Sequence, residues 1–201
     1  MSVATDIITL AEAREALNLA TGTEDTILAA YVSAASMTLD ALCGAVVNRT
    51  VTAEVHELGC DVAAIWPRTT PIYSVTSVTE YASDGTSTAL TAETVSSKPA
   101  SGYWWRSGLN FIQRRSAGFA YSFPAFGVVS VTYVAGRYAS TSAVDAKFKT
   151  ACKMLLANMW RFERGTGTQT FGSDGTGLPG FLVPNAVTAL LADELLPPGI
   201  A

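Results

Sequence analysis

The chain has 201 residues, of which 49% are hydrophobic and only 15% charged, and its formal net charge is −4. This length suits one medium domain, or a compact core that carries one insertion. The acidic balance argues against a protein that holds nucleic acid through its phosphates. No run of about 20 apolar residues predicts a membrane helix, and the first residues lack the basic start and apolar segment of an export signal.

The three cysteines, Cys43, Cys60 and Cys152, are widely spaced and form no C-x-x-C pair. An odd number at such spacing argues against a disulfide framework and against a zinc site. Cys43 and Cys152 fall within helix patterns, where a free cysteine usually serves as a small core hydrophobe. A reducing cytoplasm is the expected setting.

The first 44 residues predict a pair of helices. Thr9-Leu10-Ala11-Glu12 has the form of a capping box and predicts a short helix to about Leu19. A longer helix is expected from Asp25 or Thr26 to Gly44, which suits the left-handed position after a helix. Its apolar residues recur at spacings of three and four, which indicates one buried stripe. The stripe consists of Leu28, Tyr31, Ala35, Leu39 and Leu42.

Residues 49–135 have the alternating pattern of β-strands. Strands are predicted from Val51 to His56, on both sides of the turn Asp84-Gly85, and from Val129 to Gly136. Two further strands are expected in GYWWRS (102–107) and LNFIQRR (109–115), joined near Ser107-Gly108.

Helix patterns return at residue 143. A basic amphipathic helix is predicted over 143–164, followed by a glycine-rich stretch over 165–184 and a short helix that Asn185 caps. The expected fold is α+β: a mainly helical core (helix pair, long helix and short C-terminal helix) with an antiparallel β insertion. We expect one domain over 1–164, with its helical core at 9–44 and 143–164 and its β insertion at 49–135. Residues 165–201 then form a glycine-rich arm with the short helix.

The glycine-rich stretch GTGTQTFGSDGTGLPGFLVP is not a phosphate-binding loop. A P-loop requires a lysine and follows a strand, whereas this stretch contains neither lysine nor arginine and follows a predicted helix. The sequence therefore predicts a flexible tether of small residues, with Phe181, Leu182, Val183 and Pro184 as an apolar anchor.

No residue pattern in this sequence predicts a catalytic site. His56 is the only histidine, so a Ser-His-Asp or Cys-His site would have to use it. It lies within an alternating strand, where a surface or half-buried histidine is the simpler interpretation. Asp193-Glu194 is interpreted as a solvated helix face, and no carboxylate pair suits acid–base chemistry. We expect no enzyme, metal or cofactor.

The aromatic run Tyr103-Trp104-Trp105 raises the possibility of a stacking platform for a sugar or a base. Adjacent strand residues point to opposite faces, so the two tryptophans cannot share one platform. One packed inward and one at an edge or subunit contact is the more economical interpretation. Arg114-Arg115 is interpreted as a lone basic pair at the end of a strand.

Several passages, taken in order, resemble the head–tail connector (adaptor) proteins of tailed double-stranded DNA phages. The N-terminal helices TLAEAREALNL and EDTILAAYVSAASMTLDALCG precede NRTVTAEVHEL and the proline-bounded IWPRTTPIYSVTSVTEYASDG. The strand VSVTYVAGRY and the helix DAKFKTACKMLLANMWRFERG complete the series. The resemblance covers roughly Thr9 to Arg164. Residues 102–126 are longer than the family's usual β segment, and their role is open.

The resemblance implies a structural virion protein and not an enzyme. Family members form a ring, commonly of twelve subunits, beneath the portal, so the implied partners are further copies of the chain, the portal protein and a stopper or tail-completion protein. Double-stranded DNA passes through the lumen without sequence-specific binding, and no membrane is involved. The implied location is the virion neck, after synthesis in the host bacterial cytoplasm.

C-terminal segments in this family often dock on the portal. The resemblance therefore implies portal contacts for the apolar residues of the arm: Phe171, Leu178, Phe181, Leu182, Val183 and Pro184. Two rival hypotheses are a tail-completion or minor capsid protein, and a β-rich carbohydrate-binding module that uses Trp104 or Trp105. An enzyme that depends on His56 comes third.

Overall fold

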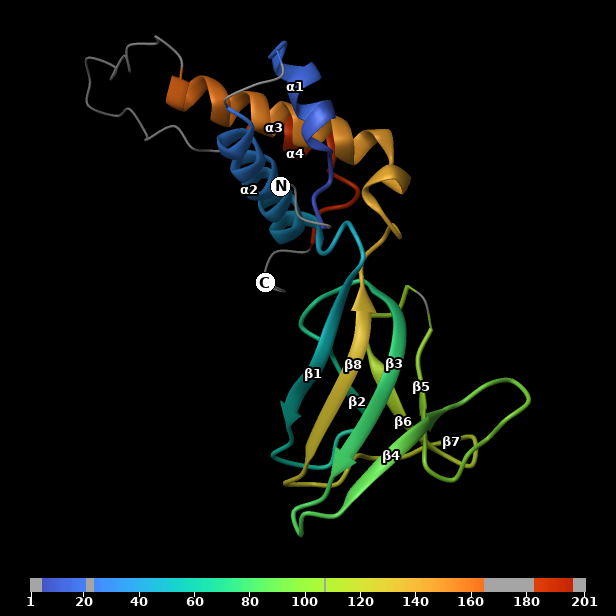
Figure 1. Cartoon of the computed structure of the whole chain (residues 1–201). Coiled ribbons are helices and arrows are strands. Elements are labelled where there is room, and N and C mark those ends of the chain that lie inside the picture. The colour runs from blue at the N-terminus through green and yellow to red at the C-terminus, as the bar shows by residue number, and fades with distance from the viewer. Residues whose placement is uncertain (1–4, 21–23, 107, 165–182, 197–201) are drawn as a thin grey trace, which may run out of the picture. The chain divides into compact units, whose positions relative to one another are not determined.

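The protein is described here by a computed structural model, which covers residues 5–20, 24–106, 108–164 and 183–196 (Figure 1). The chain divides into two compact units. The helical unit contains the described residues of 1–47 and 138–201, and the β unit consists of residues 48–137.

The helical unit is built from four α-helices and one short 3-10 helix. They are α1 (Leu10–Leu17), α2 (Asp25–Cys43), η1 (Thr141–Ala143), α3 (Ala146–Arg164) and α4 (Asn185–Leu190). The predicted capping box is confirmed: the Thr9 hydroxyl accepts a hydrogen bond from the Glu12 amide at 3.2 Å, and the Glu12 carboxylate accepts one from the Thr9 amide at 2.7 Å. These two bonds satisfy amides that the first turn leaves free.

One apolar core joins the helices of this unit. The predicted stripe of α2 packs in this core, where Leu28, Ala35 and Leu39 are buried. The predicted core positions of Cys43 and Cys152 are confirmed, since both side chains are fully buried. By length and hydropathy α2 also meets the criteria for a membrane span. Its buried stripe accounts for that composition as a core helix.

The C-terminal helix belongs to this core. Val187 and Leu191 of the α4 region are fully buried among the core residues. The Leu196 amide donates a hydrogen bond of 2.8 Å to the Leu42 carbonyl, so the chain after α4 is tied to the end of α2. This part of the chain therefore contributes to folding.

The β unit is one eight-stranded mixed sheet. Its strands are β1 (Arg49–Glu57), β2 (Ala64–Ile65), β3 (Ile72–Tyr81), β4 (Ser87–Ala92), β5 (Gly102–Trp104), β6 (Ile112–Ser116), β7 (Phe119–Ala120) and β8 (Val128–Ala135). The order is β1-β8-β3-β4-β5-β6-β2, and β7 pairs with β6. The predicted Asp84-Gly85 turn is confirmed between β3 and β4, with Gly85 at a φ of 85°.

The strands β1, β3 and β8 form the most extensive part of the sheet. In β8 every second residue is buried, including Val129, Val131 and Tyr133. This alternation is typical of a strand with one face toward a core. Interior residues from the other strands, among them Ile112 and Phe123, complete the core of the β unit.

The prediction of a mainly helical core with an antiparallel β insertion is wrong. The largest single element is the eight-stranded sheet, and helices account for 31% of the described residues. The sheet is also mixed, because β4 and β5 pair in parallel through Thr91 with Gly102 and Ala92 with Tyr103. Strand alternation is visible locally in the sequence, whereas the pairing of segments far apart along the chain is not.

Candidate interaction surface on the β unit

An open groove of about 890 Å³ lies along the edge strand β1. Residues of both β1 and β2 line this groove. These two strands stand at the opposite ends of the strand order. The sheet is therefore curled, with the groove where its two ends approach each other. The lining residues are Ala53, Glu54, Val55, His56, Glu57, Leu58, Val62, Ala64, Ile65, Trp66 and Arg68.

Glu54 fixes one wall of this groove. Its carboxylate accepts a hydrogen bond from the Tyr133 hydroxyl at 2.7 Å and one from the Arg68 amide at 2.9 Å. Burial, followed by the hydrogen bond to Glu54, raises the pKa of Tyr133 to about 12. A register shift between Val51 and Glu54, with Ala53 at a φ of 51°, turns this part of β1. A bulge of this kind re-aims side chains at a sheet edge.

His56 is a groove residue on the same strand. Its Nε2 lies 2.9 Å from the Glu54 carboxylate but makes no hydrogen bond to any residue that the structure describes. The contact is therefore an ion pair only when the imidazole is protonated. The imidazole side chain is 14% exposed, which agrees with the interpretation of a half-buried strand histidine. Among the residues that the structure describes, no cluster of His, Cys, Asp and Glu is arranged to hold a metal.

Three aromatic rings form a cluster at the Trp66 side of the groove. Phe111 lies between Trp66 and Trp104, with ring centroids 6.4 Å and 6.1 Å away and planes tilted by 49° and 50°. Trp66 is 65% exposed. These tilts do not produce a flat stacking platform, but an exposed tryptophan next to a groove is typical of an anchor in a protein contact.

The predicted basic pair Arg114-Arg115 lies near the end of β6, and both arginines have acidic partners. Arg114 is buried in the β unit, where Nε and Nη2 each donate to the Glu80 carboxylate at 2.9 Å. Arg115 is partly buried and its Nε donates to Glu93 at 3.1 Å. Each cation thus has its own acidic partner on another strand or its edge.

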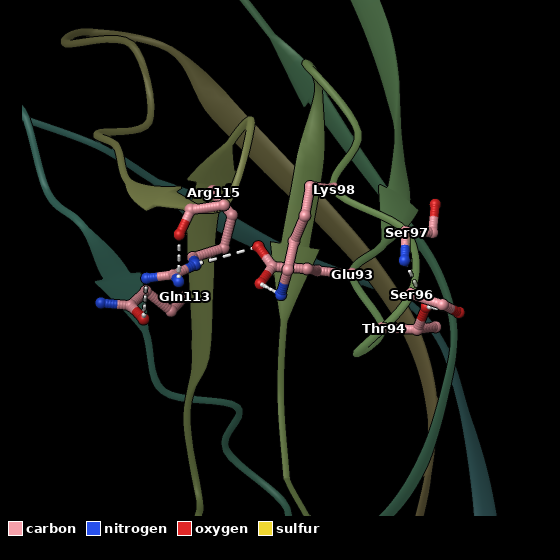
Figure 2. A network of polar contacts seen from close by, with 8 residues as sticks. Glu93, Thr94, Ser96, Ser97, Lys98, Gln113 and Arg115 are labelled. Atoms are coloured by element: carbon pink, nitrogen blue, oxygen red, sulfur yellow. Dashed lines mark hydrogen bonds and ion pairs between the residues drawn. The ribbon is translucent and has the colours of Figure 1, made fainter.

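Glu93 organises the connection between β4 and β5 (Figure 2). Its carboxylate side chain is only 3% exposed and accepts hydrogen bonds from Lys98 at 2.6 Å and from Arg115 at 3.1 Å. These bonds, that of Lys98 first, lower the pKa of Glu93 below its ordinary 4.5. The Ser97 amide donates to the Thr94 hydroxyl at 3.0 Å, which closes the turn. Val95, between these anchors, is fully exposed.

The predicted arm residues are for the most part outside the described residues. Phe171, Leu178, Phe181 and Leu182 fall in the range 165–182, which the structure does not describe. Val183 and Pro184 are half-buried, and Val183 packs against the core of the helical unit. Asp193 is exposed as expected and pairs with Lys147, while Glu194 is partly buried.

Sequence reasoning missed Glu54, Trp66 and Val95. Trp66 stands before Pro67 in a segment that the sequence marks only as a turn, and Val95 lies in a polar stretch without periodicity. The Asp84-Gly85 hairpin fixes where β4 begins, but nothing local indicates that the next connection is held by Glu93. An isolated tryptophan in a turn was the one available signal for this surface.

No protein-family model matches the chain, and no curated protein matches it. Solved structures do. A chain in the neck of an empty gene transfer agent (GTA) particle with C6 symmetry has a TM-score of 0.57 and 22% identity, over 97% of this chain and 94% of that chain. A chain in the neck of a native GTA particle with C12 symmetry has a TM-score of 0.54 and 20% identity, over 96% and 92%.

A chain in the virion of a native GTA particle is also similar, with a TM-score of 0.52 and 21% identity over 97% of this chain and 94% of that chain. The matches include both the helical unit and the β unit, since nearly all of each chain is covered. At these identities the similarity is one of fold. The expected resemblance to head–tail connector proteins is thereby confirmed at the level of fold: the chain has a fold found in the neck of GTA particles.

Proposed function

We propose that the protein is a structural component of the neck of a phage-like particle. The observation that carries this proposal is the similarity over nearly the whole chain to subunits of GTA necks. Fold alone does not fix function. The proposal is supported further by the exposed apolar side chains of the β unit, among them Trp66 and Phe119, because large exposed apolar groups mark contact surfaces.

The specific role that we propose is an adaptor ring between the portal and the stopper or tail. The neck structures with C6 and C12 symmetry support a symmetric ring, and a dodecamer is the expected form. A net charge of −4 suits a lumen through which double-stranded DNA passes without being held. The role is that of assembly and not of an enzyme, and it requires no cofactor.

The proposed contact with the portal lies in the arm. Its apolar residues are Phe171, Leu178, Phe181, Leu182, Val183 and Pro184. An apolar anchor on a glycine-rich tether is suited to ordering on a partner, as segments that fold on binding do. Deleting the chain from residue 178 onward is a poor test, because Val187 and Leu191 belong to the helical core.

Substitution within the arm provides a clean test. F181S/L182S is expected to weaken co-sedimentation with portal rings at least about tenfold, as the loss of a hot spot does, while the circular dichroism spectrum stays unchanged. T166S/T168S, in the same segment, is the matched control. Binding of the double variant at the level of the control would refute the portal contact. Failure of the unaltered protein to bind portal rings would count against the adaptor role itself.

A further inference from the structure

The groove and the β4–β5 loop lie on opposite sides of the curled sheet. The strand order β1-β8-β3-β4-β5-β6-β2 has seven positions, and β4 is the fourth, with three strands on each side of it. Because β1 and β2 meet at the groove, β4 lies across the β unit from it. Figure 1 shows the connection from β4 to β5 extending away from β1 and β2. One unit thus carries a hollow and a projection on opposite sides.

The projection is a fixed loop with an apolar tip. Glu93 at its beginning and Lys98 near its end are joined by an ion pair of 2.6 Å, and Arg115 holds Glu93 from β6 (Figure 2). The Thr94 amide donates to the Ser97 carbonyl at 3.0 Å, so the turn between them is closed. Val95 is nevertheless 100% exposed. A loop ordered in advance loses little entropy on binding, which favours association.

The groove has apolar side chains in its walls, which complement the apolar tip of the β4–β5 loop. Its apolar walls include Val55, Ile65 and Trp66, and the first and last of these are 45% and 65% exposed. Among the described strands β1 pairs with β8 alone, so its other edge has no strand partner there, and an edge of this kind can accept an additional peptide segment.

Charges on the two surfaces also match. Glu57 lines the groove, is exposed, and forms no ion pair within the part of the chain that the structure describes. Lys98 at the base of the loop keeps 48% of its side chain exposed although it contacts Glu93. A carboxylate at the groove and an ammonium beside the apolar tip would attract each other and set the orientation of docking.

We propose that the groove of one copy receives the Val95 loop of a second copy. The contact joins two different surfaces of the same chain, so it repeats from copy to copy and closes into a ring when the rotation permits. This inference rests on the proposed function, because it gives the ring of the neck a specific contact between subunits. Val95 and Trp66 are the paired anchors, and the Glu93 ion pairs hold the loop in the shape that inserts.

Cysteine cross-linking tests this contact directly. Cys60 is exposed and lies between Leu58 and Val62, both of which line the groove, whereas Cys43 and Cys152 are buried. In V95C, mild oxidation is expected to join the introduced thiol of one copy to Cys60 of the next. Because every copy then carries two different reactive sites, non-reducing gels should show a ladder of three or more chains. The matched control V95C/C60S should lose this ladder.

The result separates this inference from the proposed function when rings are counted independently by electron microscopy. Rings without a ladder, or only the dimers that a contact between two V95C loops would give, overturn the docking of Val95 in the groove and leave the neck role intact. A ladder without closed rings supports the docking and counts against the ring. Cross-links of V95C to added portal protein alone would also overturn the inference.

Point substitutions provide a second readout without cysteine chemistry. V95D places a charge at the apolar tip and W66A removes the anchor of the groove, so each should lower the yield of assembled rings at least about tenfold. F126A is the matched control, because Phe126 is 76% exposed but does not line the groove. Equal losses in F126A and W66A, or normal ring yield in V95D, would contradict the proposed contact.

Discussion

Glu80 of β3 and Arg114 of β6 form a bidentate ion pair across the interior of the curled sheet. Two hydrogen bonds of 2.9 Å join the carboxylate to Nε and Nη2, and the two side chains are 12% and 6% exposed. β3 and β6 are not neighbours in the strand order, since β4 and β5 lie between them. Arg114 Nη1 also donates to the Gly102 carbonyl at 3.2 Å. The pair therefore connects strands that backbone pairing does not.

Breaking this pair should destabilise the protein strongly. R114M leaves the Glu80 carboxylate buried without its cation, and loss of one partner of a buried pair costs about 3–5 kcal/mol. Urea denaturation followed by tryptophan fluorescence measures this loss. R106M is the matched control, because Arg106 is exposed, and it should change the free energy of unfolding by less than about 0.5 kcal/mol.

The double variant E80L/R114M tests the physical reason. If the loss in R114M comes from an uncompensated buried charge, removal of both charges should restore much of the stability. If E80L/R114M is instead as unstable as R114M, the side-chain shape of Arg114 and its bond to Gly102 matter more than the charge.

Local patterns predicted the elements of this fold better than their assembly. The capping box at Thr9 and the stripe of α2 appear where the sequence places them, because each depends on residues of a single helix. Contacts inside the sheet, such as that of Glu80 with Arg114, join residues that are 34 positions apart. No periodicity in the sequence indicates such a pairing. For this reason the sequence predicts a mainly helical core, whereas the structure contains an eight-stranded sheet.

The candidate surface was even less visible in the sequence. Trp66 lines the groove together with residues of β1, and the loop that carries Val95 is held by the ion pairs of Glu93 with Lys98 and Arg115. Neither relationship is visible in the sequence. The sequence shows Arg114 and Arg115 only as a basic pair, because it does not indicate which acidic side chains face them. The expected core positions of Cys43 and Cys152 needed only helix periodicity, and these were predictable.

The three cysteines should differ sharply in reactivity. Burial raises the pKa of the Cys152 thiol to about 12, and Cys43 is fully buried, whereas Cys60 is exposed. Because the thiolate is the reactive form, one thiol per chain should react with a chromogenic disulfide reagent at pH 8, and three in denaturant. C60S should show none before denaturation. Rapid reaction of a second thiol in the native protein would contradict the burial of Cys43 and Cys152.

The α4 region should contribute to global stability. Leu191 is fully buried in the helical core, so L191A should lower the free energy of unfolding by about 2–5 kcal/mol. L190A is the matched control, since Leu190 is only partly buried and should cost clearly less. Thermal or urea denaturation measures both variants. Equal effects of L190A and L191A would argue that this helix does not pack in the core.

The β4–β5 loop should lose its order in acid. The pKa of Glu93 is lower in the folded protein than its ordinary 4.5, because Lys98 and Arg115 donate to the charged carboxylate. A lowered pKa stabilises the fold above the ordinary value, and this contribution is lost as pH falls through the lowered pKa. Hydrogen exchange at the Thr94 and Ser97 amides, corrected for intrinsic rates, should therefore accelerate below about pH 4.5.

E93Q removes the titrating group and serves as the matched variant for this loop. It should show fast exchange at Thr94 and Ser97 already at pH 7, with no further pH-dependent step, because a neutral amide replaces the carboxylate that Lys98 and Arg115 hold. Amides of β8 provide the internal reference, since they should stay protected in both proteins. Loop protection in E93Q equal to that of the unaltered chain would show that the turn bonds of Thr94 and Ser97 hold the loop without Glu93.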